Sequence, residues 1–337
     1  MQKFFGCLPD GAQATLYHIS CGPISAEITD YGASLVQLTV PDRNGVCADV
    51  VLGYDNCSGY RSGNACLGAT VGRNANRIGG SSFQLGEAVC HLTPNENGNN
   101  LHSGPDFYHK RLWKLVEHTS SSVTLRLLSP DGDQGFPGDA VVQVTYSLAS
   151  NKTLTVRYSG YSNKDTVFNL TNHSYFNLAG QDQTDRAMDQ ILTLPSRGFT
   201  AADAASIPTG EVRAVDGTPM DFRTPKALGR DIGEPYDALQ LQHGYDHNYE
   251  VFSIPCAILE DPVSGRTMSI STDCPGLQLY TGNFLDEIGK NGVHYGPRSG
   301  VALETQFFPD SLNHPEWKQP ITKAGERYIS ETKYRFI

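Results

Sequence analysis

The chain has 337 residues, of which 39% are hydrophobic and 18% are charged, a composition typical of globular proteins rather than disordered or fibrous ones. Its formal net charge of −10 at pH 7 makes nucleic acid and anionic membranes unsuitable partners and favours a small neutral ligand. No stretch approaches the ~18 consecutive apolar residues of a membrane-spanning helix, so no membrane partner is expected.

The N-terminal residues 1–17 have only Phe4 and Phe5 as an apolar pair before Gly6, and they lack the hydrophobic region of a secretory signal. Eight cysteines are spread along the chain without a C-x-x-C pair. This pattern fits neither a zinc ribbon nor a disulfide-dense secreted domain. We therefore expect reduced thiols and a cytoplasmic location.

Short apolar or alternating runs predict β-strands along the whole chain. Turn residues separate the runs, including Asp131-Gly132 and Pro137-Gly138. Helical periodicity is scarce, and residues 225–233 offer at most one or two helical turns. The predicted fold is all-β: one large antiparallel β-sandwich spanning residues 1–337, with few short helices. The predicted strands are 25–32, 34–41, 122–129, 141–148, 154–160, 189–195, 247–254, 267–273 and 277–283.

A histidine lies within the strand-like stretch 167–178. Alternation places one set of side chains on an apolar face, namely Phe168, Leu170, Phe176 and Leu178. The opposite face carries Asn169, Thr171, His173, Tyr175 and Asn177. A polar face with an imidazole and an aromatic ring suits a sugar-sized cleft. A structural histidine bonded to neighbouring amides fits the same pattern.

A second strand pattern, in residues 300–317, holds a lone carboxylate. Glu304 lies within a strongly apolar run, where burial raises the pKa of a carboxyl group toward the range of a general base. A surface glutamate on an edge strand is the other interpretation. Polar groups also gather beside glycine at residues 72–80, 100–105 and 244–250, and each of these stretches alone fits a turn as well as a site.

Several kinds of chemistry are disfavoured by the motifs. His243 and His247 would share a face only on a helix, whereas Gly244 favours a loop, and the chain has no His-x-His or His-Glu-x-x-His motif. No metal is expected for this reason. Residues 72–80 lack the lysine of a P-loop and the glycine spacing of a dinucleotide site, and no G-x-S-x-G elbow occurs.

Two carbohydrate-related alternatives are harder to separate from the sequence. A glycosidase needs two carboxylates that flank the scissile bond, and no acidic pair stands out. A non-catalytic sugar-binding β-sandwich would share the polar face and the aromatic residues, but it would not need a histidine acid and a glutamate base.

Taken together, seven motifs between residues 72 and 317 resemble the aldose 1-epimerase family, whose members are also called galactose mutarotases. In the order typical of that family they are GRNANRI, NLHSGP, DGDQGFPG, TNHSYFNLAG, YDHNY, GLQLYTGNFL and ALETQFFPDSLNHPEW. The resemblance implies a large antiparallel β-sandwich with an open cleft on one sheet. It also implies an enzyme that acts on a monosaccharide without a cofactor or metal, and we expect a monomer or weak homodimer.

The resemblance assigns roles residue by residue. His173 matches the general acid of the family, and Glu304 matches its general base. Five residues match positions that hold the sugar hydroxyls or orient the catalytic pair: Asn76, Arg77, His102, Asp246 and Gln278. Ser103 stands where glycine is common, which affects only the expected backbone of that loop.

The implied reaction interconverts the α and β anomers of unphosphorylated hexoses such as galactose and glucose. A base removes the proton of the anomeric hydroxyl while an acid protonates the ring oxygen. A hexose-6-phosphate 1-epimerase is the nearest alternative, but it would need further cationic groups, and the motifs hold no arginine cluster beyond Arg73 and Arg77. Trp113, Phe308 and Trp317 are candidates for packing on the sugar.

Overall fold

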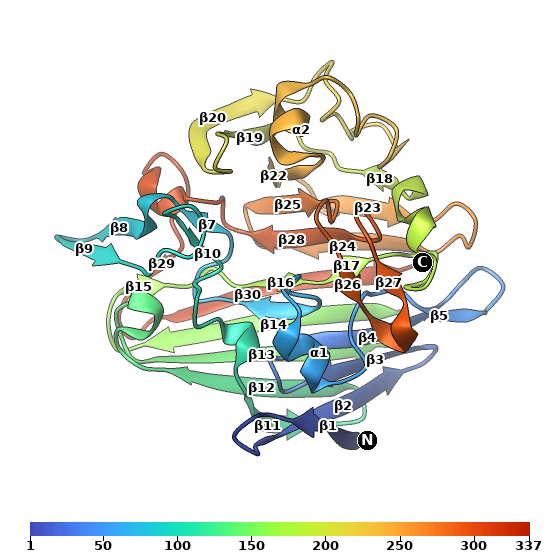
Figure 1. Cartoon of the computed structure of the whole chain (residues 1–337), viewed down its shortest axis with the longest axis horizontal. Coiled ribbons are helices and arrows are strands. Elements are labelled where there is room, and N and C mark those ends of the chain that lie inside the picture. The colour runs from blue at the N-terminus through green and yellow to red at the C-terminus, as the bar shows by residue number, and fades with distance from the viewer.

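The computed structural model describes residues 1–337, and antiparallel β-strands dominate it (Figure 1). The first sheet is a five-stranded meander of β1 (Gln2–Cys7), β2 (Gln13–Cys21), β3 (Ile24–Thr29), β4 (Ser34–Pro41) and β5 (Cys47–Asp49). The second has nine strands in the order β11 (Lys114–His118), β12 (Ser122–Ser129), β13 (Ala140–Ala149), β14 (Thr153–Ser162), β30 (Arg327–Phe336), β24 (Thr267–Thr272), β23 (Ala257–Glu260), β18 (Ile191–Thr193) and β21 (Lys226–Ala227).

The third large sheet carries most of the site described below. Its six strands follow the order β17 (Tyr175–Phe176), β28 (Val301–Gln306), β25 (Gly276–Tyr280), β22 (Asp246–Glu250), β19 (Gly198–Ala202) and β20 (Pro208–Ala214). Five two-stranded ribbons complete the fold: β6 (Ala69–Val71) with β16 (Thr171–His173), β7 (Arg77–Ile78) with β10 (Asn100–Leu101), β8 (Ser82–Leu85) with β9 (Ala88–His91), β15 (Thr166–Val167) with β29 (Ile321–Thr322), and β26 (Glu287–Ile288) with β27 (His294–Tyr295).

Helices are short in this fold. The two α-helices are α1 (Cys57–Ser62) and α2 (Asp237–Gln242), and six 3₁₀ segments lie at Gly79–Ser81, Tyr108–Lys110, Asp133–Gly135, Thr184–Asp189, Lys290–Gly292 and Ser311–Asn313. Asn56 begins α1 by accepting a hydrogen bond from the Gly59 N–H, as an N-cap residue does. Neither α-helix has the length or the apolar character that crossing a membrane requires.

The inner face of the nine-stranded sheet packs against the other two large sheets. Alternation along β12 buries Val123, Leu125 and Leu127 and turns their neighbours outward. One cluster of 52 buried residues joins these side chains to Ile28 of the first sheet and Leu303 of the third. Burial of each such side chain contributes about 1.5–3 kcal/mol. The layers form a sandwich, and the predicted fold class is confirmed.

All nine predicted strands are confirmed, and β4 and β12 have the predicted bounds. The suggested helical turn within 225–233 is wrong. Lys226 and Ala227 form β21, which pairs with β18, and the Lys226 ammonium donates to the Pro219 carbonyl and to Asp231. These bonds hold the segment at the sheet edge, and the helix lies further on, at α2.

The stretch 167–178 is more broken than its alternation suggests. It holds the end of β15, then β16 and β17, and these strands pair with β29, β6 and β28 respectively. The predicted apolar face is confirmed, because Phe168, Leu170, Phe176 and Leu178 all belong to the main core. The residues of the opposite face are also buried. The histidine on that face therefore lies in a sheltered environment.

Candidate active site

A pocket of about 490 Å³ lies over the face of the six-stranded sheet that is turned away from the core. Six of the seven predicted site residues line it: Asn76, Arg77, His102, His173, Asp246 and Glu304. Gln278 is not among the lining residues, but its Nε2 donates to Asp246 Oδ1 at 2.7 Å. Segments that are far apart in the sequence thus meet at one pocket.

Glu304 comes from β28, which lies between β17 and β25 in the six-stranded sheet. All six residues of β28 are buried. Leu303 belongs to the main core, whereas Glu304 lines the pocket and is only 2% exposed. The interpretation of Glu304 as a surface residue on an edge strand is therefore wrong. The antiparallel register places Gln278 opposite Glu304 and Asn248 opposite Gln278.

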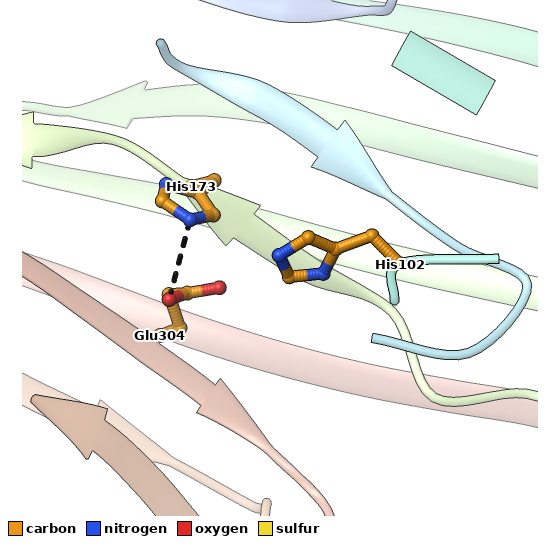
Figure 2. A group of neighbouring side chains, drawn as sticks. All are labelled: His102, His173 and Glu304. Atoms are coloured by element: carbon orange, nitrogen blue, oxygen red, sulfur yellow. Dashed lines mark ion pairs between the residues drawn. The ribbon is translucent and has the colours of Figure 1, made fainter. Parts of the chain in front are cut away.

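His173 ends β16 and faces Glu304 (Figure 2). Tyr175 pairs with Ala302 in the β17–β28 register, so continuing that register two residues back sets His173 opposite Glu304. The distance from His173 Nε2 to Glu304 Oε1 is 3.5 Å. The imidazole of His102 packs edge-on against that of His173, with ring centres 5.5 Å apart.

Two loops are tied together at the pocket wall. The Asn76 N–H donates to His102 Nδ1 at 3.1 Å, and the His102 N–H donates to the Asn76 carbonyl at 3.0 Å. His102 and Ser103 both have positive φ, 54° and 59°, which explains why glycine suits the second position. Ser103 is held there because its hydroxyl donates to the Asn74 carbonyl and accepts from the Asn74 N–H.

Arg77 follows Asn76 and carries the positive charge of the pocket. Its Nε and one terminal nitrogen donate to the two oxygens of Glu96 at 2.6 and 2.9 Å, the paired geometry that suits guanidinium and carboxylate. Arg73, by contrast, is fully buried and donates to Tyr108, Thr166 and backbone carbonyls, so it supports the fold. Only one of the two motif arginines therefore serves the pocket.

Burial shifts the titration of the facing pair. It lowers the pKa of His173 to about 4. Burial, and next the negative charge of Asp246, raise the pKa of Glu304 well above its usual range, and Arg77 opposes that rise. Burial also lowers the pKa of His102 well below its ordinary value, so this imidazole is neutral. The pair at 3.5 Å offers one proton acceptor and one proton donor when it holds a single proton.

His102, His173 and Glu304 also form a group whose possible ligand atoms all lie within 4.8 Å of one another. Spacing in the sequence gave no sign of this group, because its members come from a loop and two different strands. The hydrogen bonding does not suit a metal. His102 Nδ1 accepts the Asn76 N–H, so the proton of the neutral ring is on Nε2. Metal-bound histidines instead donate from their second nitrogen.

The pocket wall contains residues that the sequence did not reveal. Its aromatic side chains are Phe107, Tyr175, Tyr280 and Phe284, and its further acidic side chains are Glu96, Asp286 and Glu287. The three predicted sugar-packing residues are not among the lining residues: Trp113 is in the main core, and Phe308 packs edge-on against Trp317. Two of these residues carried a sequence signal: Tyr175 is on the polar face of 167–178, and Tyr280 lies on the predicted strand 277–283, two residues after Gln278.

Comparison with known proteins agrees with this arrangement. Residues 15–335 match the protein family described as aldose 1-epimerase. The chain belongs to the aldose 1-epimerase family. Galactose mutarotase of Mus musculus is 38% identical, with 98% of this chain and 97% of the mouse protein covered. Aldose 1-epimerase of Haemophilus influenzae is 37% identical, with 97% of each chain covered.

Solved structures of the family share the fold. The crystal structure of a GalM/aldose epimerase homologue from C. elegans superimposes with a TM-score of 0.88 at 31% identity, covering 96% of this chain and 98% of that one. The predicted family and enzyme class are confirmed by these matches: the protein is a carbohydrate epimerase of the mutarotase type.

Proposed function

We propose that the protein interconverts the α and β anomers of free hexoses such as galactose and glucose, with Glu304 as general base and His173 as general acid. The observation that carries this proposal is the pair of facing groups, 3.5 Å apart, within a sugar-sized pocket. The ring oxygen and the anomeric hydroxyl of a pyranose are both bonded to the same carbon. A base and an acid side by side therefore suit both oxygens at once.

The proposed reaction moves two protons and no other atoms. Glu304 takes the proton of the anomeric hydroxyl, His173 gives its proton to the ring oxygen, and the bond between the ring oxygen and the anomeric carbon breaks. The open aldehyde turns about its bond to the next carbon. The two groups then act in reverse, and the ring closes with the other anomeric configuration. Neither a cofactor nor a metal takes part in this sequence.

The other five predicted residues hold the sugar or the pair in this proposal. His102 presents its Nε2–H as a donor, because its Nδ1 accepts the Asn76 N–H. Asp246 accepts a hydrogen bond from a sugar hydroxyl, while Gln278 Nε2 donates to Asp246 Oδ1 and fixes the orientation of the carboxylate. Arg77 donates from Nη1, the guanidinium nitrogen that Glu96 leaves free. These residues bind sugar hydroxyls that are not on the anomeric carbon, so the bond from the anomeric carbon to the next carbon remains free to rotate.

The charge of the pocket favours a neutral substrate over a phosphorylated one. Five carboxylates line it, from Glu96, Asp246, Asp286, Glu287 and Glu304, and Arg77 is the single lysine or arginine among the lining residues. A phosphate dianion would meet repulsion from most of the wall. This supports free hexoses over the hexose 6-phosphates of the alternative proposal.

We also infer a cytoplasmic protein that is a monomer or weak homodimer. All eight cysteines are free of disulfides, as suits a reducing compartment. A net charge of −10 opposes close association of two copies. Light scattering during size-exclusion chromatography measures the molar mass directly, and a stable tetramer would contradict this inference.

Polarimetry on freshly dissolved α-galactose and α-glucose tests the proposed function. Catalytic amounts of protein should speed the decay of optical rotation to its unchanged equilibrium value, and dialysis against a chelator should leave the rate intact. Glucose 6-phosphate should react far more slowly at equal concentration. A sugar-binding module would leave the spontaneous rate unchanged. Loss of activity on chelation, with recovery on adding zinc, would restore the metal alternative.

A further inference from the structure

Unpartnered polar atoms are concentrated around the catalytic pair. Fourteen buried side-chain nitrogen and oxygen atoms in the protein have no hydrogen-bond partner. Eight of them belong to six residues of this region: Thr171, His173, Asn248, Gln278, Glu304 and Gln306. Each unpartnered buried group costs about 1–3 kcal/mol, and native proteins leave few of them. Such a concentration at one place requires a physical explanation.

The strand registers place these residues on one continuous face. Gln278 is opposite Glu304, and Asn248 is opposite Gln278, in the β22–β25–β28 order. Gln306 lies two residues after Glu304 on the same side of β28. Continuing the β17–β28 register sets Thr171 opposite Gln306, just as it sets His173 opposite Glu304. We call Thr171, Asn248, Gln278 and Gln306 the polar floor.

The polar floor is sealed from the pocket. Thr171 and Gln306 are 0% exposed, Asn248 is 1% exposed and Gln278 is 4% exposed, and none of the four lines the pocket. A sugar therefore has no access to them. Both amide atoms of Asn248 and both of Gln306 lack partners, so the floor offers donors as well as acceptors. Only a molecule as small as water, which donates and accepts, suits such a site.

The catalytic carboxylate shares this unsatisfied surface. Glu304 Oε1 faces His173, whereas Oε2 is buried and has no partner. In Figure 2 this second oxygen lies on the side of the carboxylate that is nearer His102. A carboxylate that accepts one more hydrogen bond is fixed in orientation, and proton transfer depends steeply on orientation.

We propose that the polar floor binds ordered water and that Gln306 is a positioning residue, which holds such a water against Glu304 Oε2. The inference rests on the proposed function only for its kinetic consequence. The Gln306 amide acts through the water on the base and does not touch the sugar. Thr171, on the neighbouring strand, closes the same water site with its hydroxyl.

Steady-state polarimetry on the full chain tests the kinetic part, with Gln306→Met and Thr171→Val as variants. Methionine keeps the length of glutamine without its amide, and valine keeps the shape of threonine without its hydroxyl. We expect kcat to fall about ten- to hundredfold in Gln306→Met, with KM nearly unchanged, because the sugar contacts remain. Thr171→Val should lower kcat in the same way, by a smaller factor.

The pH profile separates positioning from a purely structural role. Both variants leave in place the charged and titratable groups around Glu304, which are His102, His173, Asp246, Arg77, Tyr175, Tyr280, Tyr334 and Cys66. Removal of a water that donates to the carboxylate should therefore move the alkaline limb of kcat to higher pH in both variants. Tyr158→Phe is the matched control, since it removes an unpartnered hydroxyl elsewhere in the main core. Tyr158→Phe should leave kcat and the alkaline limb of the pH profile unchanged.

The outcomes are distinct. If folded Gln306→Met and Thr171→Val keep the kcat and the pH profile of the wild type, the proposal is wrong. If these variants also unfold at a higher temperature, the unpartnered polar groups of the floor only lower the stability of the protein. If Gln306→Met does not fold, the nearly isosteric Thr171→Val decides alone. High-resolution crystallography of the wild type tests the water site even if the protein proves inactive. Water density bridging Gln306 and Glu304 is expected, and a dry floor would contradict the proposal.

Discussion

Burial favours the neutral form of both His173 and Glu304, and their closeness makes them titrate as a pair. The pKa of His173 is lowered to about 4, and the pKa of Glu304 is raised well above its usual range. The apparent values belong to the pair, because the two atoms are 3.5 Å apart. Between the two titrations the pair holds one proton, and the proposed reaction starts from the form in which His173 carries that proton and Glu304 is ionised.

The rate of mutarotation should therefore follow a broad bell against pH. On the acid side kcat/KM falls as the pair gains its second proton, near the lowered His173 pKa of about 4. On the alkaline side it falls as the last proton leaves, above the ordinary carboxyl range. Initial rates by polarimetry, corrected for the spontaneous reaction, measure the profile. An acid limb near the ordinary histidine value of about 6.5 would contradict this assignment.

Asp246 and His102 should matter for the sugar more than for the fold. Asp246→Asn removes the charge of an acceptor, and His102→Ala removes the Nε2–H donor. Loss of one partner of a charged hydrogen bond costs about 1.5–3 kcal/mol, which corresponds to a roughly 10- to 100-fold fall in kcat/KM. Circular dichroism is the control. Unfolding of either variant would assign that residue a structural role instead.

At the scale of the element, the strands that alternate cleanly were predictable. β4 and β12 have the predicted bounds because burial alternates from Val36 to Pro41 in β4 and along the whole of β12, with apolar residues at most of the inward positions. Burial also alternates along β30, but its buried positions include the polar residues Ser330 and Thr332. The sequence of β30 therefore lacks a regular alternation of apolar and polar residues. β2 was not among the predicted strands.

Residue types alone predicted the two catalytic candidates, whereas the family motifs predicted the other five site residues, which are Asn76, Arg77, His102, Asp246 and Gln278. Glu304 is visible as a lone acid in an apolar run, and His173 as an imidazole on a strand. The pairing of Arg77 with Glu96 was not visible, because it depends on how two loops fold over each other. Phe107 and Phe284 of the pocket wall were not predicted for the same reason: they lie in loops, and a strand pattern does not indicate where a loop runs.

Neighbouring residues of β28 should separate stability from activity. Leu303 belongs to the main core, and Leu303→Ala should lower the free energy of unfolding by about 2–5 kcal/mol. Glu304→Gln should not lower it, because the raised pKa of the folded protein means that ionising this carboxyl works against folding at neutral pH. Urea denaturation of both variants measures the contrast. A larger loss of stability in Glu304→Gln than in Leu303→Ala would contradict this division.

At the scale of the whole molecule, the core joins all three large sheets. One cluster of 52 residues takes members from near the N-terminus, such as Tyr17, through to Phe336. We propose on this basis that residues 1–337 form one domain. Differential scanning calorimetry should show a single cooperative transition for the full chain. Two resolved transitions would divide the chain into separate domains.

The central claim is that Glu304 is the base of a sugar epimerase, and turnover of a folded Glu304→Gln protein tests it most directly. Glutamine keeps the size and polarity of the side chain and removes the base. With α-galactose as substrate, polarimetry should show turnover lowered about 10²–10⁴-fold, the usual contribution of a positioned proton-transfer group. Turnover within about threefold of wild type would contradict the claim, and Asp246 would then be the next candidate for the base.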